Sequence, residues 1–314
     1  MSSMRAEIVM RKANKMLIRI HTIVSKNSIP YFFYMEKNFR SLASGDFELS
    51  FVAHCLDKDS ASCLRKELND TKVVKVYLRP RHFVVQSWKD CIRFIAATIG
   101  LPLRMAGSNG HSAGLSSALS MTGEGAIDVI ADTDTVMLQC NWDRMIAGLL
   151  DTSGIVATCY EDIGGFSSGA GKVQTYKRKP SLTWFALSPK YDWRALDPRP
   201  AKQNTIVITS DELSKLYNLP IGYELVRDVG WLVPAYLHEN QIPFTVFDQI
   251  KPTSSASMAL KTGIDYHEEY HLAGIPVLAH QRGSHKHPFR GNDISRAFYD
   301  SCDVFMHHLS DKGL

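Results

Sequence analysis

Short apolar runs alternate with segments of helical periodicity through the first half of this chain, and this alternation constrains the fold more than any other feature. Buried strands are predicted at residues 16–24, 49–57, 73–80, 103–107, 126–132 and 154–161. Helices are predicted between them, at residues 31–43, 60–69, 87–99, 112–122 and 141–151. The alternation predicts an α/β fold with a mainly parallel, mixed central sheet flanked by helices.

The composition narrows the class of protein. Of the 314 residues, 45% are hydrophobic and 22% are charged, which excludes wholesale disorder, collagen-like repeats and a coiled coil. The net charge of +4 is only mildly basic, so there is no specific signature of a nucleic-acid-binding protein. The apolar runs are too short to cross a membrane, the N-terminus lacks the apolar core of a secretory signal, and the six cysteines contain no CxxC pair. We therefore expect a cytoplasmic protein with no transmembrane segment, disulfide framework or zinc ribbon.

Two carboxylates follow directly on the fifth predicted strand, where Asp132 and Asp134 enclose Thr133. Parallel sheets bind ligands at the carboxyl ends of their strands. Paired carboxylates at that edge can hold a hard divalent cation and the phosphates that it bridges. The spacing also arises by chance, as in Asp57 and Asp59, so a solvated turn or a helix N-cap is the alternative interpretation. Asp59 is itself a suitable N-cap for the helix predicted at 60–69.

The sequence around this pair resembles the core of the family 2 glycosyltransferases. The segment GSNGHSAGLSSALSMTGEGAIDVIADTD contains an Asn-Gly, a helix of small residues, a Gly-Glu, an apolar strand and an Asp-x-Asp. The matching residues are Asn109, Gly110, Ala113, Ala118, Gly123, Glu124, Asp132 and Asp134. The resemblance implies a divergent member with a single GT-A-type domain.

The resemblance also divides the chain by role. It implies a basic N-terminal arm at residues 1–15 and a nucleotide-sugar-binding half at residues 16–165. Residues 166–314 are then an acceptor-binding half with a histidine-rich C-terminal flap. In that half we expect a strand near 205–209, a helix near 223–240 and a strand near 243–248. The Gly- and Ser-rich residues 164–181 are expected to form a loop that closes on substrate.

Function and site residues follow from the same resemblance. It implies transfer of a sugar from a nucleotide-sugar donor to a glycan or another hydroxyl-bearing acceptor, with Mn²⁺ or Mg²⁺ as cofactor and inversion as the outcome. Asp132 and Asp134 would hold the cation against the donor diphosphate. Asp228, in RDVGWLVPAYLHENQIPFTVF, occupies the position of the catalytic base. The expected contacts to the donor come from Asp57, Asp59, Asn109 and Asp132.

A basic, histidine-rich segment, AHQRGSHKHPFRG, occupies residues 279–291. Metal-dependent nucleotide-sugar transferases commonly fold such a segment over the donor, so we expect His280 or His285 to complete the metal site. Arg282 and Lys286 would then contact the diphosphate. His280 is favoured over His285 because it follows the strand-like run PVLAH. The alternative interpretation is a solvated basic loop.

The motif HEEYH at residues 267–271 supports a competing function. On a helix, His267 and His271 would share one face and bind zinc, with Glu268 beside the metal-bound water, as in a metallohydrolase. Glycines and a proline on either side leave room for only a short helix. If the protein is a transferase, Glu268 and Glu269 would instead hold the tail or line the acceptor site. A non-catalytic module that binds nucleotide sugars or glycans is a third possibility.

Overall fold

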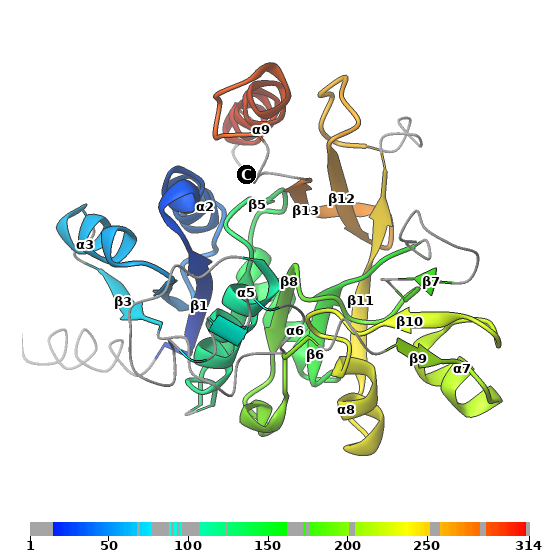
Figure 1. Cartoon of the computed structure of the whole chain (residues 1–314). Coiled ribbons are helices and arrows are strands. Elements are labelled where there is room, and N and C mark those ends of the chain that lie inside the picture. Colours follow the sequence, from blue (N-terminus) through cyan, green and yellow to red (C-terminus); the bar gives the residue numbers. More distant parts are fainter. Residues whose placement is uncertain are drawn as a thin grey trace, which may run out of the picture.

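The computed structural model shows an α/β protein built around one large sheet (Figure 1). It describes residues 15–67, 70–76, 88, 91–92, 95, 107–123, 125–161, 172–173, 176–200, 205–251, 258–282 and 287–311. The described strands of the sheet follow the order β3-β2-β1-β4-β8-β6-β11-β12-β13-β5. Their bounds are β1 Leu17–Val24, β2 Glu48–Cys55, β3 Thr71–Lys75, β4 Ile127–Ala131, β5 Thr135–Met137, β6 Ile155–Thr158, β8 Trp184–Leu187, β11 Phe244–Ile250, β12 His267–Leu272 and β13 Ile275–Gln281.

The sheet is parallel on one side and becomes mixed toward the other. Strands β3, β2, β1 and β4 are parallel neighbours, and β6 and β11 form a further parallel pair. Strand β8 lies antiparallel between β4 and β6, and β12, β13 and β5 continue the sheet from β11 as antiparallel neighbours. The predicted α/β class with a mainly parallel, mixed sheet is confirmed. Both halves of the chain contribute strands to it.

Helices cover both faces of this sheet. One face packs against α2 (Ile29–Ser41), α3 (Lys58–Glu67) and α6 (Trp142–Leu150), and the other against α5 (Gly107–Leu119) and α8 (Val233–Glu239). In β8, Trp184 and Ala186 belong to the first core, whereas Phe185 and Leu187 belong to the second. The alternating side chains of β8 thus join both cores, and the sequence analysis did not predict this strand.

The small residues of α5 allow it to approach the sheet closely. A Cβ atom added to Gly114 would lie 2.5 Å from Cγ1 of Ile23 on β1, closer than carbon atoms pack. A larger side chain would push α5 away from the strand. The helix of small residues in the sequence therefore reflects the packing of α5 on β1.

Several predicted elements differ from the structure, in one helix cap and around residue 223 most clearly. Helix α3 is capped by Asp57 rather than Asp59, since Asp57 Oδ1 accepts the Ser60 N–H at 2.7 Å. The helix predicted at 223–240 is instead a short strand, β10 (Glu224–Val226), followed by α8. Between them the chain turns at Gly230, whose φ is 83°, and Pro234 lies in the first turn of α8. The elements predicted at 87–99 and 103–107 lie largely outside the described residues.

The second half of the chain adds two smaller units. Strands β7 (Lys172–Val173), β10 and β9 (Thr205–Val207) form a three-stranded sheet, which packs with α7 (Asp211–Tyr217) around its own apolar cluster. Helix α9 (Asp293–Asp311) packs Phe298 and Tyr299 against β5 and β13. Among the described residues, no helix has the length and apolar character that a membrane crossing requires.

Candidate metal and active site

Asp132 and Asp134 lie in the tight turn that connects β4 to β5, at the carboxyl end of β4. The turn is fixed by hydrogen bonds, because the N–H and the hydroxyl of Thr135 donate to the Asp132 carbonyl at 3.2 and 2.7 Å. The Asp132 N–H donates to the Thr183 carbonyl at 2.9 Å, which ties the turn to the start of β8. Both carboxylates are therefore held at one edge of the sheet, with Asp134 only 7% exposed.

His280 reaches this turn from the other end of the sequence. Strand β13 pairs antiparallel with β5 and sets His280 opposite Thr135, while the Gln281 N–H donates to the Asp134 carbonyl at 3.1 Å. His280 Nε2 lies 3.4 Å from Asp134 Oδ1. One donor atom each from Asp132, Asp134 and His280 lies within 4.8 Å of the others. Two carboxylate oxygens and an imidazole nitrogen form a set that suits a divalent cation such as Mn²⁺.

The charges of this cluster shift the pKa values of its members. Burial, opposed by His111 and reinforced by the neighbouring Asp134, raises the pKa of Asp132 to about 6. Burial alone would lower the pKa of His280, but the carboxylates of Asp134 and Glu268 outweigh it and raise that pKa well above the ordinary value. The cluster thus concentrates negative charge that a proton on His280 or a bound cation would compensate.

A second layer of hydrogen bonds lies behind His280. Its Nδ1 lies 3.0 Å from Oε1 of Glu268, on the adjacent strand β12. The same Glu268 oxygen accepts the Tyr270 hydroxyl at 2.6 Å, and its other oxygen accepts Nε2 of Gln249 at 2.5 Å. Burial opposes ionisation of Glu268, but its hydrogen bond to His280 and the charge of that imidazole outweigh burial and lower the pKa of Glu268.

The HEEYH motif lies on a strand, so the helix that the zinc-hydrolase interpretation requires is wrong. In an extended strand, His267 and His271 are about 13 Å apart. His271 Nε2 lies 2.8 Å from Oε2 of Glu269, and Glu269 also accepts the N–H groups of Ala259 and Leu260 at 2.9 and 2.7 Å. Glu268 belongs to the cluster of His280 instead. The two histidines and Glu268 therefore do not converge on one ion.

The Tyr160 phenol is influenced by charges from both the acidic turn and the predicted base, and the sequence analysis did not identify it. Burial first, and then the charges of Glu268, Asp132 and Asp228, raise the pKa of this phenol to about 12 against a hydrogen bond from Thr183. The charges of these three carboxylates thus act on the same phenol, and one of them, Asp132, belongs to the cation cluster of Asp132, Asp134 and His280. Tyr160 follows β6, so the rule that ligands bind where strands end could have identified it.

The predicted donor contacts are described in part. Besides capping α3, Asp57 accepts the Lys26 N–H at 3.0 Å, so its carboxylate joins the ends of β1 and β2. Asp59 is exposed, with its Oδ2 3.5 Å from Nζ of Lys26. Exposed Arg282 lies with Nε 3.8 Å from Glu268 Oε2. The predicted His285 and Lys286 lie outside the described residues, as does the side chain of Asn109.

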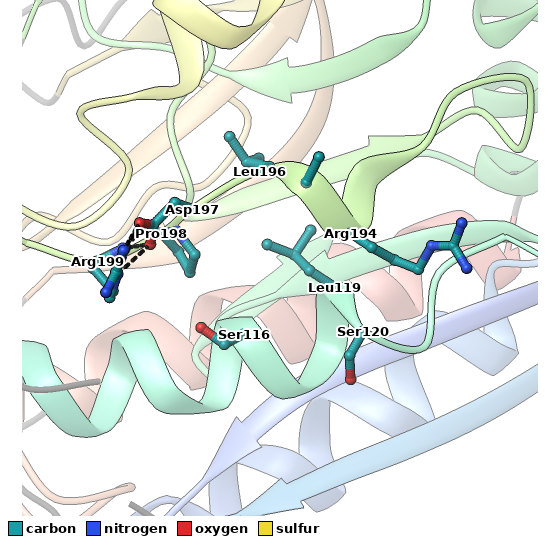
Figure 2. A pocket seen from close by; sticks show the side chains of 9 residues that line it. Ser116, Leu119, Ser120, Arg194, Leu196, Asp197, Pro198 and Arg199 are labelled. Carbon is teal, nitrogen blue, oxygen red and sulfur yellow. Dashed lines mark hydrogen bonds and ion pairs between the residues drawn. The ribbon is translucent and has the colours of Figure 1, made fainter. Parts of the chain in front are cut away.

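A separate cavity of about 300 Å³ lies between the second half of α5 and the segment formed by η3 (Trp193–Ala195) and the residues after it (Figure 2). Its lining residues are Ser116, Leu119, Ser120, Arg194, Ala195, Leu196, Asp197, Pro198 and Arg199. Arg199 lies with Nε 2.9 and 2.7 Å from the two carboxylate oxygens of Asp197, and Figure 2 shows this pair beside the cavity. Asp132, Asp134 and His280 do not line this cavity, so it is distinct from the cation cluster.

Solved structures similar to this chain include glycosyltransferases. The galactosyltransferase LgtC, in complex with donor and acceptor sugar analogs, is 13% identical over 73% of both chains, with a TM-score of 0.39. TarS of S. aureus, residues 1–349 in complex with UDP, is 12% identical over 76% of this chain and 62% of its own, with a TM-score of 0.33. A 4-diphosphocytidyl-2C-methyl-D-erythritol synthase from Anaerococcus prevotii is 10% identical over 72% of this chain and its whole length, with a TM-score of 0.35.

Other kinds of comparison give no relative. No protein-family model matches this chain, and no curated protein matches it. The structural neighbours include glycosyltransferases, as the sequence resemblance predicts, but each likeness is low.

Proposed function

We propose that this protein is a metal-dependent glycosyltransferase that moves a sugar from a nucleotide-sugar donor to an acceptor hydroxyl. The observation that carries the proposal is the convergence of Asp132, Asp134 and His280 at the carboxyl edge of the sheet. These ligands suit Mn²⁺, and the two carboxylates also suit Mg²⁺. When bound, the cation would neutralise the negative charge that develops on the departing diphosphate.

Basic and polar groups beside the cluster would hold the donor. Arg282 extends over Glu268 from the end of β13, where a guanidinium can reach a diphosphate oxygen. Lys286 and Asn109 are proposed to add further contacts. Asp57 and Asp59 lie at the end of β2, two strands from β4, and are proposed to contact the nucleoside. In this arrangement Asp57 would cap α3 and contact the nucleoside through the same carboxylate.

Asp228 is the proposed general base. In a single displacement, the acceptor hydroxyl attacks the anomeric carbon and its proton passes to the Asp228 carboxylate. The bond from that carbon to the diphosphate oxygen breaks, and the electron pair leaves with the diphosphate. Inversion at the anomeric carbon follows from this single step. The support is the sequence resemblance, in which Asp228 occupies the position of the base, together with the charge of Asp228 at Tyr160, where the charges of Asp132 and Glu268 also act.

The experiment that tests the proposal is a thermal-shift screen of nucleotide sugars with and without Mn²⁺, followed by transfer assays with the donor found. A donor at about 100 times its Kd adds about 2.7 kcal/mol to the free energy of unfolding. We expect this gain to need Mn²⁺ and to disappear in Asp134→Asn, together with transfer. The control is Asp151→Asn, which removes an exposed carboxylate at the opposite edge of the sheet. A metal-dependent gain that survives in Asp134→Asn would overturn the proposed site.

A second variant separates binding from chemistry. We expect Asp228→Asn to keep the Mn²⁺-dependent gain from the donor and to lose transfer by about 100-fold or more, the scale of a general base. Equal loss of donor affinity would show that Asp228 binds the donor instead. Donor binding by the wild-type protein without transfer to any acceptor would favour the non-catalytic binding module.

A further inference from the structure

We propose that Glu268 is a positioning residue for His280, because it orients the imidazole so that Nε2 faces the cation held by Asp132 and Asp134. The inference rests on the proposed function, since it concerns the same cation site. It assigns to Glu268 a task different from the one that the HEEYH motif suggested. Glu268 does not bind the cation in this proposal; it acts through His280.

The geometry of the imidazole carries the proposal. Its two nitrogens lie on opposite sides of the ring, and each faces a different carboxylate. Nδ1 lies 3.0 Å from Oε1 of Glu268, and Nε2 lies 3.4 Å from Oδ1 of Asp134. A ring held at Nδ1 keeps its direction, and Nε2 is then the nitrogen that the cation meets.

The direction of each hydrogen bond can be assigned. Gln249 Oε1 accepts the Glu161 N–H at 3.2 Å, so its amide nitrogen is the group that donates to Oε2 of Glu268. The Tyr270 hydroxyl donates to Oε1. Because both oxygens of Glu268 accept, Nδ1 of His280 must donate to it. A neutral imidazole that donates from Nδ1 carries its lone pair on Nε2, which is the form that binds a metal.

The neighbouring Glu269 shows what a purely structural carboxylate looks like in the same strand. Both glutamates are buried, with Glu268 4% and Glu269 0% exposed. Glu269 points to the other side of β12, where it accepts backbone N–H groups of Ala259 and Leu260. Glu268 instead turns toward His280, the imidazole that the described residues contribute to the cation cluster. The pair thus provides a matched test and control.

The test is a titration with Mn²⁺ alone, in which the free ion is measured by electron paramagnetic resonance. Outer-shell partners of a ligating histidine usually contribute 10–100-fold to metal affinity, so we expect Glu268→Gln to weaken Mn²⁺ binding by about that factor. Glu269→Gln should change the Mn²⁺ affinity by less than about twofold, even where it lowers the melting temperature. Melting curves establish that each variant is folded.

A double variant distinguishes positioning from a general electrostatic effect. If Glu268 acts through the imidazole, Glu268→Gln should have no further effect in a protein that already carries His280→Ala. A carboxylate that attracts the cation directly would weaken binding equally in both backgrounds, and that result would overturn the proposal. An unchanged Mn²⁺ affinity in Glu268→Gln would also overturn it.

Failure of the proposed function gives a different pattern. If the wild-type protein binds no Mn²⁺, or if Asp134→Asn and His280→Ala bind it as tightly as the wild type, then the cation site and the positioning role are both wrong. If those two variants lose Mn²⁺ and Glu268→Gln keeps it, the cation site stands and the positioning role alone is wrong.

Discussion

Two of the histidine and carboxylate networks among the described residues of this sheet differ in what lies at their ends. One is the cluster of Asp134, His280 and Glu268 at the carboxyl edge. The other, which we call the central network, lies beneath α5 on β2, β1 and β4, where His21 Nε2 lies 2.9 Å from Asp128 Oδ1 and His21 Nδ1 lies 2.9 Å from His54 Nε2. Both networks use the same chemical groups, so residue type alone does not separate them.

The central network is closed by protein atoms at both ends. Asp128 accepts Nε of Arg19 at 2.8 Å through one oxygen and the Gly123 N–H at 2.9 Å through the other. His21 must therefore donate to Asp128, and His54 in turn donates to His21. At the far end, His54 Nδ1 lies 2.9 Å from the Ser117 hydroxyl of α5, which completes the series. Each ring nitrogen is satisfied within the protein, as buried polar groups require.

We call the edge network open because two carboxylates of like charge converge on its imidazole. Glu268 satisfies one nitrogen of His280, and the other nitrogen faces two carboxylates whose charges repel one another. Burial raises the pKa of Asp132 to about 6, and the charge of Asp134 adds to that increase. The comparison shows that a buried histidine network is a candidate site when a proton or cation is needed to complete it. A network completed by Arg, Ser and backbone groups is structural.

The largest effect is expected for a variant that breaks the central network. Asp128→Asn removes the partner of Arg19 and His21 in a position that is 1% exposed. Removing one member of a buried charge pair typically costs about 3–5 kcal/mol, so we expect a loss of that size in the free energy of unfolding. Urea denaturation measures it. Mn²⁺ affinity should stay within about twofold of the wild type, because Asp128 lies outside the edge network. A variant of wild-type stability that binds Mn²⁺ more weakly would contradict the division into a structural and a functional network.

Much of the fold could be predicted from the sequence because its first half follows simple periodicity. Strands β1, β2, β3 and β4 and their helices lie within a few residues of the expected ranges. The sequence gives no such signal for β8, which is buried on both faces, or for β12, where a polar HEEYH run is buried by pairing with both β11 and β13. Pairing between strands distant in sequence decides both elements, and local patterns do not contain it.

The residues of the candidate site also fall into those that the sequence could locate and those that it could not. Asp132 and Asp134 could be located from the strand that precedes them, and His280 from the run PVLAH. Tyr160 could have been located in the same way, since it follows β6, but the role of Glu268 could not, because it depends on β11, β12 and β13 lying side by side in the sheet. His21, His54 and Asp128 carried no signal, since they belong to no common motif and each lies on a different strand. Their register across β1, β2 and β4 is what brings them together.

A smaller effect is expected when the pH is changed, because His21 and His54 of the central network are buried. Burial, reinforced by the charges of His21 and Lys72, lowers the pKa of His54 well below 6.5, and burial also lowers that of His21 against the pull of Asp128. The unfolded chain then binds more protons than the folded protein below pH 6.5. These two histidines therefore leave the free energy of unfolding at its full value above pH 6.5. Below pH 6.5 they lower it by up to about 1.4 kcal/mol per pH unit for each histidine.

Urea denaturation between pH 7 and pH 5 measures this slope. His54→Gln removes one of the two groups, so its slope below pH 6.5 should be smaller than that of the wild type by up to about 1.4 kcal/mol per pH unit. The exposed His308 of α9 provides the control, because His308→Gln removes a histidine that water solvates in both states. Equal slopes for the wild type and His54→Gln would mean that protons reach the central network without unfolding the protein. That network would then be as open as the edge network, and its assignment to structure would be wrong.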